Sequence, residues 1–182
     1  MELNKVLRQT VKELLVESFD LPFNWNWESP NEATFEVDNR EYFVLFLYLN
    51  DISGEIPEFS NYDLSFSGWD VSFGVKNYDY DNEDFSYNFS IETKDYKAIR
   101  ILSTVVSAIN SFVERMEPNL LIINVDNDTN LNRFTVYKKM LNRYLPPDFN
   151  FVQTRDNKFN YDQLLIYHDI YQETMENILG VA

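Results

Sequence analysis

The chain has no cysteine, one histidine and only four glycines in 182 residues. Without cysteine it can form no disulfide, thiol nucleophile or cysteine metal site. The single histidine, His168, excludes a polyhistidine zinc site. Because no G-x-S-x-G motif accompanies it, a structural role is favoured over a Ser-His catalytic pair. Scarce glycine with 15 Phe, 12 Tyr and 3 Trp indicates an ordered, strand-rich protein.

Long apolar runs are also missing. No run approaches the roughly 18 residues typical of a membrane span, and the N-terminus shows no basic region followed by an apolar core. We therefore expect a cytoplasmic protein without a membrane partner. The length of 182 residues predicts one domain, 1–182, that buries its core without metals or disulfides. Within it, residues 1–20 would form an N-terminal helix and residues 168–182 a C-terminal extension.

Positive charge is scarce in the middle of the chain. The formal net charge is -15, and residues 28–92 carry 15 acidic but only 2 basic side chains. Phosphate binding depends on lysine and arginine, so direct binding of nucleic acid by this region is not expected. The acidic region is expected either to solubilise the protein or to attract a basic partner.

The first part of the chain is predicted to form a helix and then antiparallel strands. Leucine and valine recur at helical spacing over residues 2–18. Aromatic residues then alternate with asparagine from Phe23 to Trp27, and a further extended run follows a turn at Thr34 to Val37. The segment from Tyr42 to Leu49 is apolar throughout, which predicts a central strand covered on both faces.

A hairpin is predicted after a long connection over residues 50–66. Apolar and polar residues alternate over 69–75 and again over 85–91, as in strands with one buried and one polar face. The turn between them contains four acids that could ligate a hard cation: Asp79, Asp81, Glu83 and Asp84. Because the turn lacks the glycine and terminal glutamate of a calcium loop, we interpret it as an acidic hairpin turn.

The second half alternates between helix and strand. The predicted elements are a helix over 95–116, a strand over 120–125, a helix over 130–144, and two strands over 149–154 and 161–167. The apolar stripe of the first helix runs from Ala98 to Met116. The last fifteen residues either add a short helix or trail away. This order predicts an α+β fold with a mixed, mainly antiparallel sheet and packed helices.

A family resemblance lies in the strand, turn and helix of residues 119–144. GNAT acetyltransferases commonly show a V-x-x-x-N-x-x-A-x-x-L-Y-x-K-x-G-F pattern at this place. The chain matches its spacing at Asn130, Val136, Tyr137 and Lys139, and Val125 lies one position before the place of the pattern's valine. Arg133 replaces the small residue of the pattern, and no Gly-Phe follows Leu141. The order of elements from Phe23 to Tyr167 also resembles the GNAT order of antiparallel strands, long helix, strand, helix and hairpin.

The resemblance implies one catalytic candidate. In active GNAT enzymes the tyrosine at the Tyr137 position often protonates the departing CoA thiolate, which requires its hydroxyl to lie beside the sulfur. The alternative interpretation, which we favour, is a core aromatic side chain on a helix face. No general base stands out, because the spacing of the many carboxylates, including Glu36, Glu41, Asp70 and Glu92, singles out none.

The resemblance also implies a place for acetyl-CoA at the start of the long helix. Active members hold the CoA pyrophosphate on backbone N–H groups of a glycine-rich turn there. The corresponding residues 91–99 contain no glycine, and Asp95 and Tyr96 add charge and bulk. If acetyl-CoA binds, the residues expected to hold it are Thr93, Lys94, Lys97, Arg100 and Asn130. The favoured alternative is a helix capped by Thr93 or Asp95 with its lysine and arginine solvated, and hence no cofactor.

These observations predict a non-catalytic, acidic interaction protein. Small acidic GNAT-like proteins with poor cofactor turns are similar to poorly characterised proteins of tailed bacteriophages, which implies a virion component or a modulator of a host protein. The expected partner is a protein, either a basic nucleic-acid-binding protein approached by DNA mimicry or a virion protein. The expected location is the host cytoplasm or the virion. The alternative is an acetyl-CoA-dependent N-acetyltransferase with an unusual cofactor turn.

Overall fold

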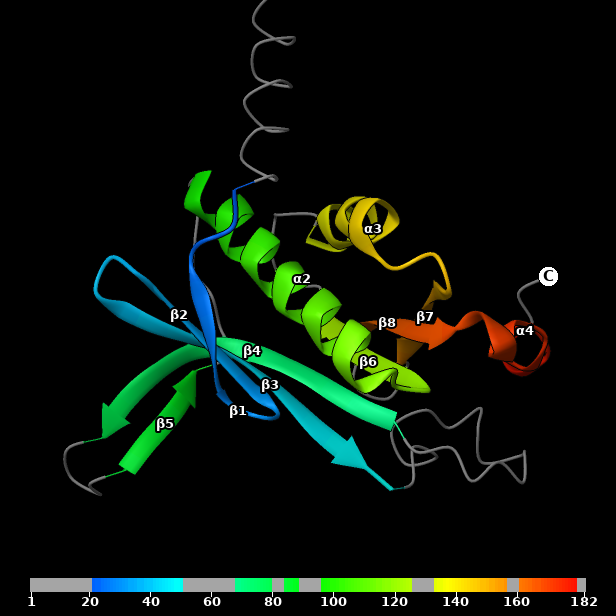
Figure 1. Ribbon diagram of the computed structural model, residues 1–182, viewed down its shortest axis with the longest axis horizontal. Coiled ribbons are helices and arrows are strands. Elements are labelled where there is room, and N and C mark those ends of the chain that lie inside the picture. The colour runs from blue at the N-terminus through cyan, green and yellow to red at the C-terminus, as the bar shows by residue number, and fades with distance from the viewer. Residues whose placement is uncertain are drawn as a thin grey trace, which may run out of the picture.

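The computed structural model describes residues 21–50, 68–79, 84–88, 96–125, 133–156 and 161–179. In chain order the elements are β1 (Trp25–Ser29), β2 (Glu32–Val37), β3 (Arg40–Leu49), β4 (Gly68–Asp79), β5 (Asp84–Asn88), α2 (Tyr96–Met116), β6 (Leu120–Val125), α3 (Arg133–Tyr144), β7 (Phe149–Asp156), β8 (Tyr161–His168), the 3-10 helix η2 (Asp169–Tyr171) and α4 (Gln172–Leu179) (Figure 1). The predicted helix over 2–18 and the connection over 51–66 lie outside the described residues.

One sheet joins all the described strands. Its order is β1-β2-β3-β4-β6-β8-β7, and β5 pairs with β4 beside this path. Only β4 and β6 run parallel, and every other described pair is antiparallel. The predicted α+β class with a mixed, mainly antiparallel sheet is therefore confirmed.

Helices α2 and α3 cover one face of this sheet, which we call the helix face (Figure 1). The apolar stripe of α2 is buried from Ala98 to Val113, as its helical spacing predicts. It packs on inward-facing residues of the central strands, such as Val44 and Ile123. The prediction was wrong for Met116, which is 43% exposed, because it occupies the last position of the helix.

Aromatic side chains fill the core where α2 crosses the first strands. Phe112 stacks on Phe46 with ring centroids 3.9 Å apart, and Trp27 and Trp69 contact Phe112 at 6.3 Å and 5.1 Å. Edge-on ring pairs such as Trp69 and Phe112, whose planes meet at 73°, stabilise a core beyond the area they bury. These four residues come from β1, β3, β4 and α2, so they connect the start of the sheet with the long helix.

Polar and cationic residues of α2 hold the segment that leads into β1. The Arg100 Nε donates to the carbonyl of Leu21 at 2.9 Å, and its guanidinium lies 4.0 Å from the centre of the Phe23 ring. Further along the helix, the Thr104 hydroxyl accepts from the Phe23 amide at 2.9 Å. Residues 21–27 therefore run alongside α2 and parallel to it.

The same arrangement continues toward the end of α2. The Trp25 Nε1 donates to the Ser107 hydroxyl at 3.2 Å. Arg115 donates to the carbonyl of Pro30 and stacks over the Trp27 ring at 3.9 Å. The face of an aromatic ring attracts a cation. Arg115 therefore stabilises the first strand by its aromatic contact with Trp27 and its hydrogen bond to Pro30.

The opposite face of the sheet, which we call the outer face, carries a second apolar cluster. Buried Leu120, Ile122, Leu165 and Tyr167 project from β6 and β8, and Met175 and Ile178 of α4 pack on them. Residues 168–179, part of the predicted C-terminal extension, thus include a short helix that covers β6 and β8.

Strand β3 is covered on both faces near its middle. Val44 is buried on the helix face and Phe43 on the outer face, each fully inaccessible. This agrees with the prediction of a central strand, and β3 lies third in the sheet order. At the far end of the strand, Leu47 and Tyr48 are 44% and 52% exposed.

A tight turn joins β2 to β3. Its two central residues, Asp38 and Asn39, both have positive φ, of 52° and 60°. A two-residue hairpin turn of type I′ requires positive φ at both positions, and aspartate and asparagine tolerate it better than most residues. The turn sets the register, so that Val37 pairs with Arg40 and Glu36 lies directly opposite Glu41.

Candidate functional site

Tyr137, the catalytic candidate, lies on α3 and faces the sheet. It is 1% exposed and ranks among the largest fully buried side chains. Its ring meets Phe73 of β4 edge-on, with centroids 6.1 Å apart and planes at 70°. Met140 and Leu141 of the same helix are buried in the same cluster. This environment matches the alternative prediction of a core aromatic residue.

Phe73 and Tyr137 meet where the sheet changes partners. On one edge of β4, the first part pairs with β6 over Trp69–Val71 and Leu121–Ile123 only. From Val75 onward β4 pairs with β5 instead. Strand β6 therefore parts from β4 beyond Val71, and Phe73 lies between the two pairings.

Two of the predicted cofactor-binding residues lie on the first turns of α2 and contact other parts of the chain. Lys97 forms an ion pair with Asp38 in the β2-β3 turn. Arg100 holds Leu21 and Phe23, as described above. They are thus not simply solvated, as the alternative interpretation expected, because the β2-β3 turn and residues 21–23 lie within their reach. Thr93, Lys94 and Asn130, the remaining predicted cofactor residues, lie outside the described residues.

A chain of polar side chains crosses the outer face at the junction of β4, β6 and β8. The Asp70 carboxylate accepts from the Ser72 hydroxyl at 3.0 Å and from the Asn124 amide at 3.2 Å. Gln163 in turn donates to the Asn124 carbonyl at 3.0 Å. Since Gln163 is 1% exposed, this hydrogen bond satisfies a buried polar group that would otherwise be costly. Asp70, one of the predicted carboxylates, is therefore used to join strands.

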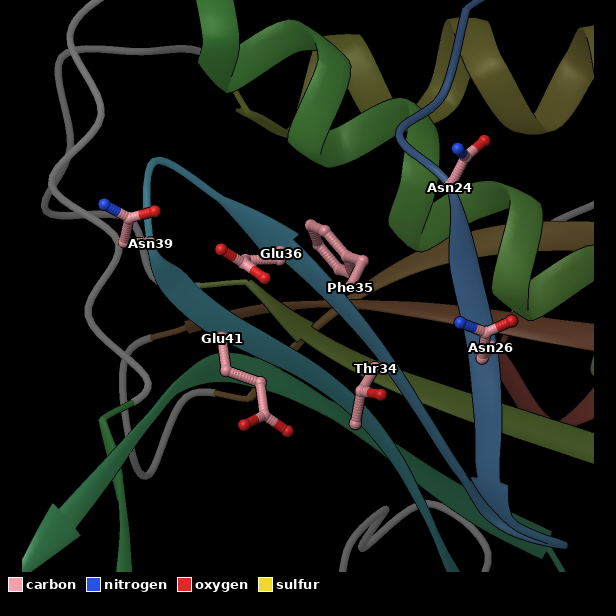
Figure 2. Close-up of a pocket in the computed structure, with 7 residues that line it drawn as sticks. All are labelled: Asn24, Asn26, Thr34, Phe35, Glu36, Asn39 and Glu41. Atoms are coloured by element: carbon pink, nitrogen blue, oxygen red, sulfur yellow. The ribbon is translucent and has the colours of Figure 1, made fainter.

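A depression of about 490 Å³ lies at the β1 end of the sheet (Figure 2). We call it the acidic hollow, and its lining residues are Asn24, Asn26, Thr34, Phe35, Glu36, Asn39 and Glu41. Strand alternation explains the polar set, because Asn26 pairs with Thr34 on neighbouring strands and Glu36 with Glu41. All of these positions except Phe35 are exposed or half-buried. The hollow thus offers two carboxylates, three amides and a hydroxyl to solvent.

Lys76 neutralises only one side of the hollow. Its ammonium group lies 3.4 Å from carboxylate oxygens of both Glu32 and Glu41, and its side chain is only 10% exposed. Burial lowers the pKa of Lys76, but the charges of Glu32 and Glu41 and their hydrogen bonds raise it, and the net pKa lies above its ordinary value of 10.5. Lys76 is therefore firmly charged and committed to two acids.

Glu36 has no such neutralisation. Within the residues that the structure describes, no cation forms an ion pair with it, and Asp38, two positions away, is paired with Lys97. Like charges placed directly opposite on neighbouring strands destabilise a sheet. The pair of Glu36 and Glu41 therefore costs the free protein stability, although the bond from Lys76 to Glu41 reduces this cost.

His168 has a structural role at the end of β8. Its Nδ1 accepts a hydrogen bond from the Ile170 amide at 3.3 Å and so caps η2. The same nitrogen lies 2.7 Å from Asp169, and the ring meets Phe149 edge-on at 5.0 Å. These contacts fit the predicted structural role of the single histidine. Among the described residues no group of three or more histidine, cysteine or acidic side chains could hold a metal ion.

The acidic hollow was not predicted as a site, although its residues gave partial signals. The asparagines that alternate with tryptophan in β1 indicated a polar outer face, and Glu36 and Glu41 were noted as strand carboxylates. What the sequence alone could not provide was the register that brings Asn24, Glu36 and Glu41 together. The Asp38-Asn39 dipeptide, typical of a two-residue hairpin, was the signal that could have supplied it.

Comparisons with known proteins add no relative. No protein-family profile, curated sequence or solved structure matches the chain. In the described part of the chain, no helix is long and apolar enough to cross a membrane.

Proposed function

We propose that this protein is a GNAT-like scaffold without acetyltransferase activity that acts by binding a basic protein partner. The observation that carries the proposal is the burial of Tyr137, at 1% exposure, against Phe73. A general acid has to reach the reacting sulfur, whereas this side chain serves the packing of α3 on the sheet.

The order and pairing of the elements support the GNAT-like part of the proposal. Antiparallel strands β1 to β4 precede the long helix α2, and β6, α3 and the β7-β8 hairpin follow it. The parallel pair among the described strands, β4 with β6, parts after three residues.

The loss of cofactor binding is supported by the contacts of α2. Lys97 is held by Asp38, and Arg100 by Leu21 and Phe23. A phosphate would have to compete with these contacts for both cations. The junction over 91–99 also contains no glycine. Both observations favour a structural role for the start of α2, which stabilises the β2-β3 turn and residues 21–23, over a role in cofactor binding.

The binding role is supported by the charge of the first strands. Residues 21–50 and 68–76 carry six carboxylates and two cations, and Glu36 and Glu41 lie exposed in the acidic hollow. An excess of one charge attracts partners of opposite charge and accelerates their association. We place the protein in an infected bacterial cell or a virion, where a DNA-binding or virion protein would supply the basic surface.

Acetyl-CoA titration separates this proposal from the alternative, an active N-acetyltransferase. That alternative is favoured by the parting of β4 and β6. We expect no saturable heat when acetyl-CoA is titrated into the full chain at physiological concentrations. Saturable binding that is lost in Arg100→Gln, with turnover that slows in Tyr137→Phe, would establish the enzyme instead.

Salt dependence tests the partner. The immobilised full chain would be exposed to host lysate at low and at high salt, and captured proteins would be identified and purified. We expect a basic protein whose affinity for the chain falls steeply as salt rises. Capture that does not depend on salt, or a captured partner that is acidic, would contradict the proposal.

A further inference from the structure

We propose that the acidic hollow is the part of this surface that receives the partner, and that it takes arginine side chains. The inference rests on the proposed function, since it names where and by which chemistry the basic partner is bound. The first observation is geometric: a depression of about 490 Å³ is lined by residues of β1, β2, β3 and the β2-β3 turn (Figure 2).

The volume of the hollow is much larger than that of a bare ion. A water molecule occupies about 30 Å³ of liquid, and sites for organic groups commonly measure about 300–1,000 Å³. The hollow therefore has room for one or more extended side chains. Its polar lining of asparagine, threonine and glutamate side chains suits a ligand with several hydrogen-bond donors.

The charge pattern selects a cation. Glu36 lies directly opposite Glu41, and within the described residues Lys76 reaches Glu41 but forms no ion pair with Glu36. A bound cation would relieve the repulsion between these carboxylates. The free protein thus carries a local destabilisation that binding removes.

Arginine fits the lining better than lysine. Its planar guanidinium presents five N–H donors in a fixed fork, which can engage a carboxylate with two parallel bonds and still reach a neighbouring acceptor. The side-chain carbonyls of Asn24, Asn26 and Asn39, which line the same hollow, provide such acceptors. A lysine ammonium is a compact charge with only three donors.

The test uses the full chain and a fluorescent nona-arginine peptide. Binding would be measured by anisotropy for the wild type, for the double variant Glu36→Gln/Glu41→Gln, and for the control double variant Glu114→Gln/Glu173→Gln. Both double variants lose two exposed carboxylates, so their net charges are equal. We expect affinity to fall at least about tenfold in the first variant and less than about twofold in the control.

Two further readouts separate a binding role from a structural one. Nona-lysine should bind the wild type several times more weakly than nona-arginine, and this preference should disappear in the Glu36→Gln/Glu41→Gln variant. Without peptide, Glu36→Gln should raise the midpoint of thermal unfolding, because it removes the like-charge pair. Equal affinity for both peptides, or a lowered midpoint, would overturn the inference.

The remaining outcomes distinguish the two proposals. Equal losses of affinity in both double variants would mean that net charge alone attracts the peptide. The inference about the hollow would then be wrong, while the proposed function would remain. Failure of the wild type to bind nona-arginine, although a basic partner still binds in a salt-dependent way, would have the same meaning. Binding of neither would overturn both. Saturable Ca²⁺ binding lost in Glu36→Gln/Glu41→Gln, without peptide binding, would replace the arginine site with a metal site.

Discussion

The outer face of the sheet has two halves that differ in what they offer. Where α4 covers β6 and β8 it is apolar, and Met175 and Ile178 pack on it. Around the β2-β3 turn it is polar and acidic, with exposed Glu36 and Glu41. Packing explains the first half completely, since apolar area is removed from water. It does not explain the second, where like charges oppose each other and lower stability.

Stability alone therefore explains the residues of the apolar half but not those of the acidic half. The covered half obeys the rule that apolar strand faces are buried by a neighbouring element. In the acidic half, a neutral or basic residue at Glu36 would satisfy the same strand geometry without repulsion. Packing does not require this loss of stability, and a contact with another molecule would explain it.

The largest effect is expected from a substitution that disrupts the packing of α4 on β6 and β8. Met175→Ala removes a side chain that is 1% exposed between α4 and the sheet. Loss of a buried methionine usually costs about 2–5 kcal/mol. We expect a decrease of that size in the free energy of unfolding, measured by urea denaturation. Thr174→Ala on the same helix, at a partly exposed position, is the control and should change it by less than about 0.5 kcal/mol.

A smaller effect is expected for the cation that stabilises the acidic half. Lys76→Met leaves Glu32, whose side chain is 16% exposed, without its cation. Leaving one partly buried charged group unpaired costs roughly 1–3 kcal/mol. Urea denaturation should show this loss, and Lys139→Met, at an exposed position of α3, should not. Adding Glu32→Gln to Lys76→Met should recover part of the loss, and an additive result would contradict the assigned pair.

Alkaline pH should weaken both halves. Burial and the charge of Glu176 raise the pKa of Tyr167 above its ordinary value of 10.0, although the hydrogen bond to Gln172 lowers it, and the pKa of Lys76 is raised above 10.5. For both groups the unfolded chain releases its proton at lower pH than the fold does. Their stabilisation is therefore complete below about pH 10 and falls as pH rises through the raised values.

Unfolding measured by urea at several pH values checks this expectation. The free energy of unfolding should decline above about pH 10. The decline should be less steep in Tyr167→Phe and in Lys76→Met, because each removes one of the two groups. An unchanged slope in both variants would mean that other groups control the alkaline limit.

The smallest expected effect sharpens the contrast by changing the sign of one charge. Glu36→Lys places a cation directly opposite Glu41, and opposite charges on paired strands contribute about 0.2–1 kcal/mol. Thermal unfolding should show a slightly more stable protein. In the background of Glu41→Gln the gain should vanish, whereas a gain that persists would assign it to net charge instead.

Much of the fold followed from residue patterns. Strand alternation, continuous apolar runs and helical spacing located β1 to β8, α2 and α3 to within a few residues, because each of these elements shows one of these patterns. Met116 continues the apolar spacing of α2 but is exposed, because helical periodicity does not show whether the last residue of a helix is covered. The position of α4 could not be predicted, because its apolar partners include Leu120 and Ile122 of β6, about 50 positions earlier in the chain.

The site was less predictable than the fold. Tyr137 could be named because the spacing of its helix resembles a known pattern, but its burial depends on contact with Phe73 across the sheet. The roles of Lys97 and Arg100 depend on a hairpin about 60 to 80 positions earlier in the chain. Sequence gives the chemistry of such groups, whereas their partners are set by tertiary structure.

The contacts between α2 and residues 21–30 carry a consequence for how the protein is made. Arg100 and Arg115 donate hydrogen bonds to Leu21 and Pro30, and Ser107 accepts one from Trp25, so these bonds join residues 79, 85 and 82 positions apart. A ribosome would therefore have to release more than half of the chain before the first strand acquires its clamp. Until then the acidic hairpin emerges without its covering helix. Contacts of such long range slow folding, so the first strand to be synthesised is expected to be among the last to be secured.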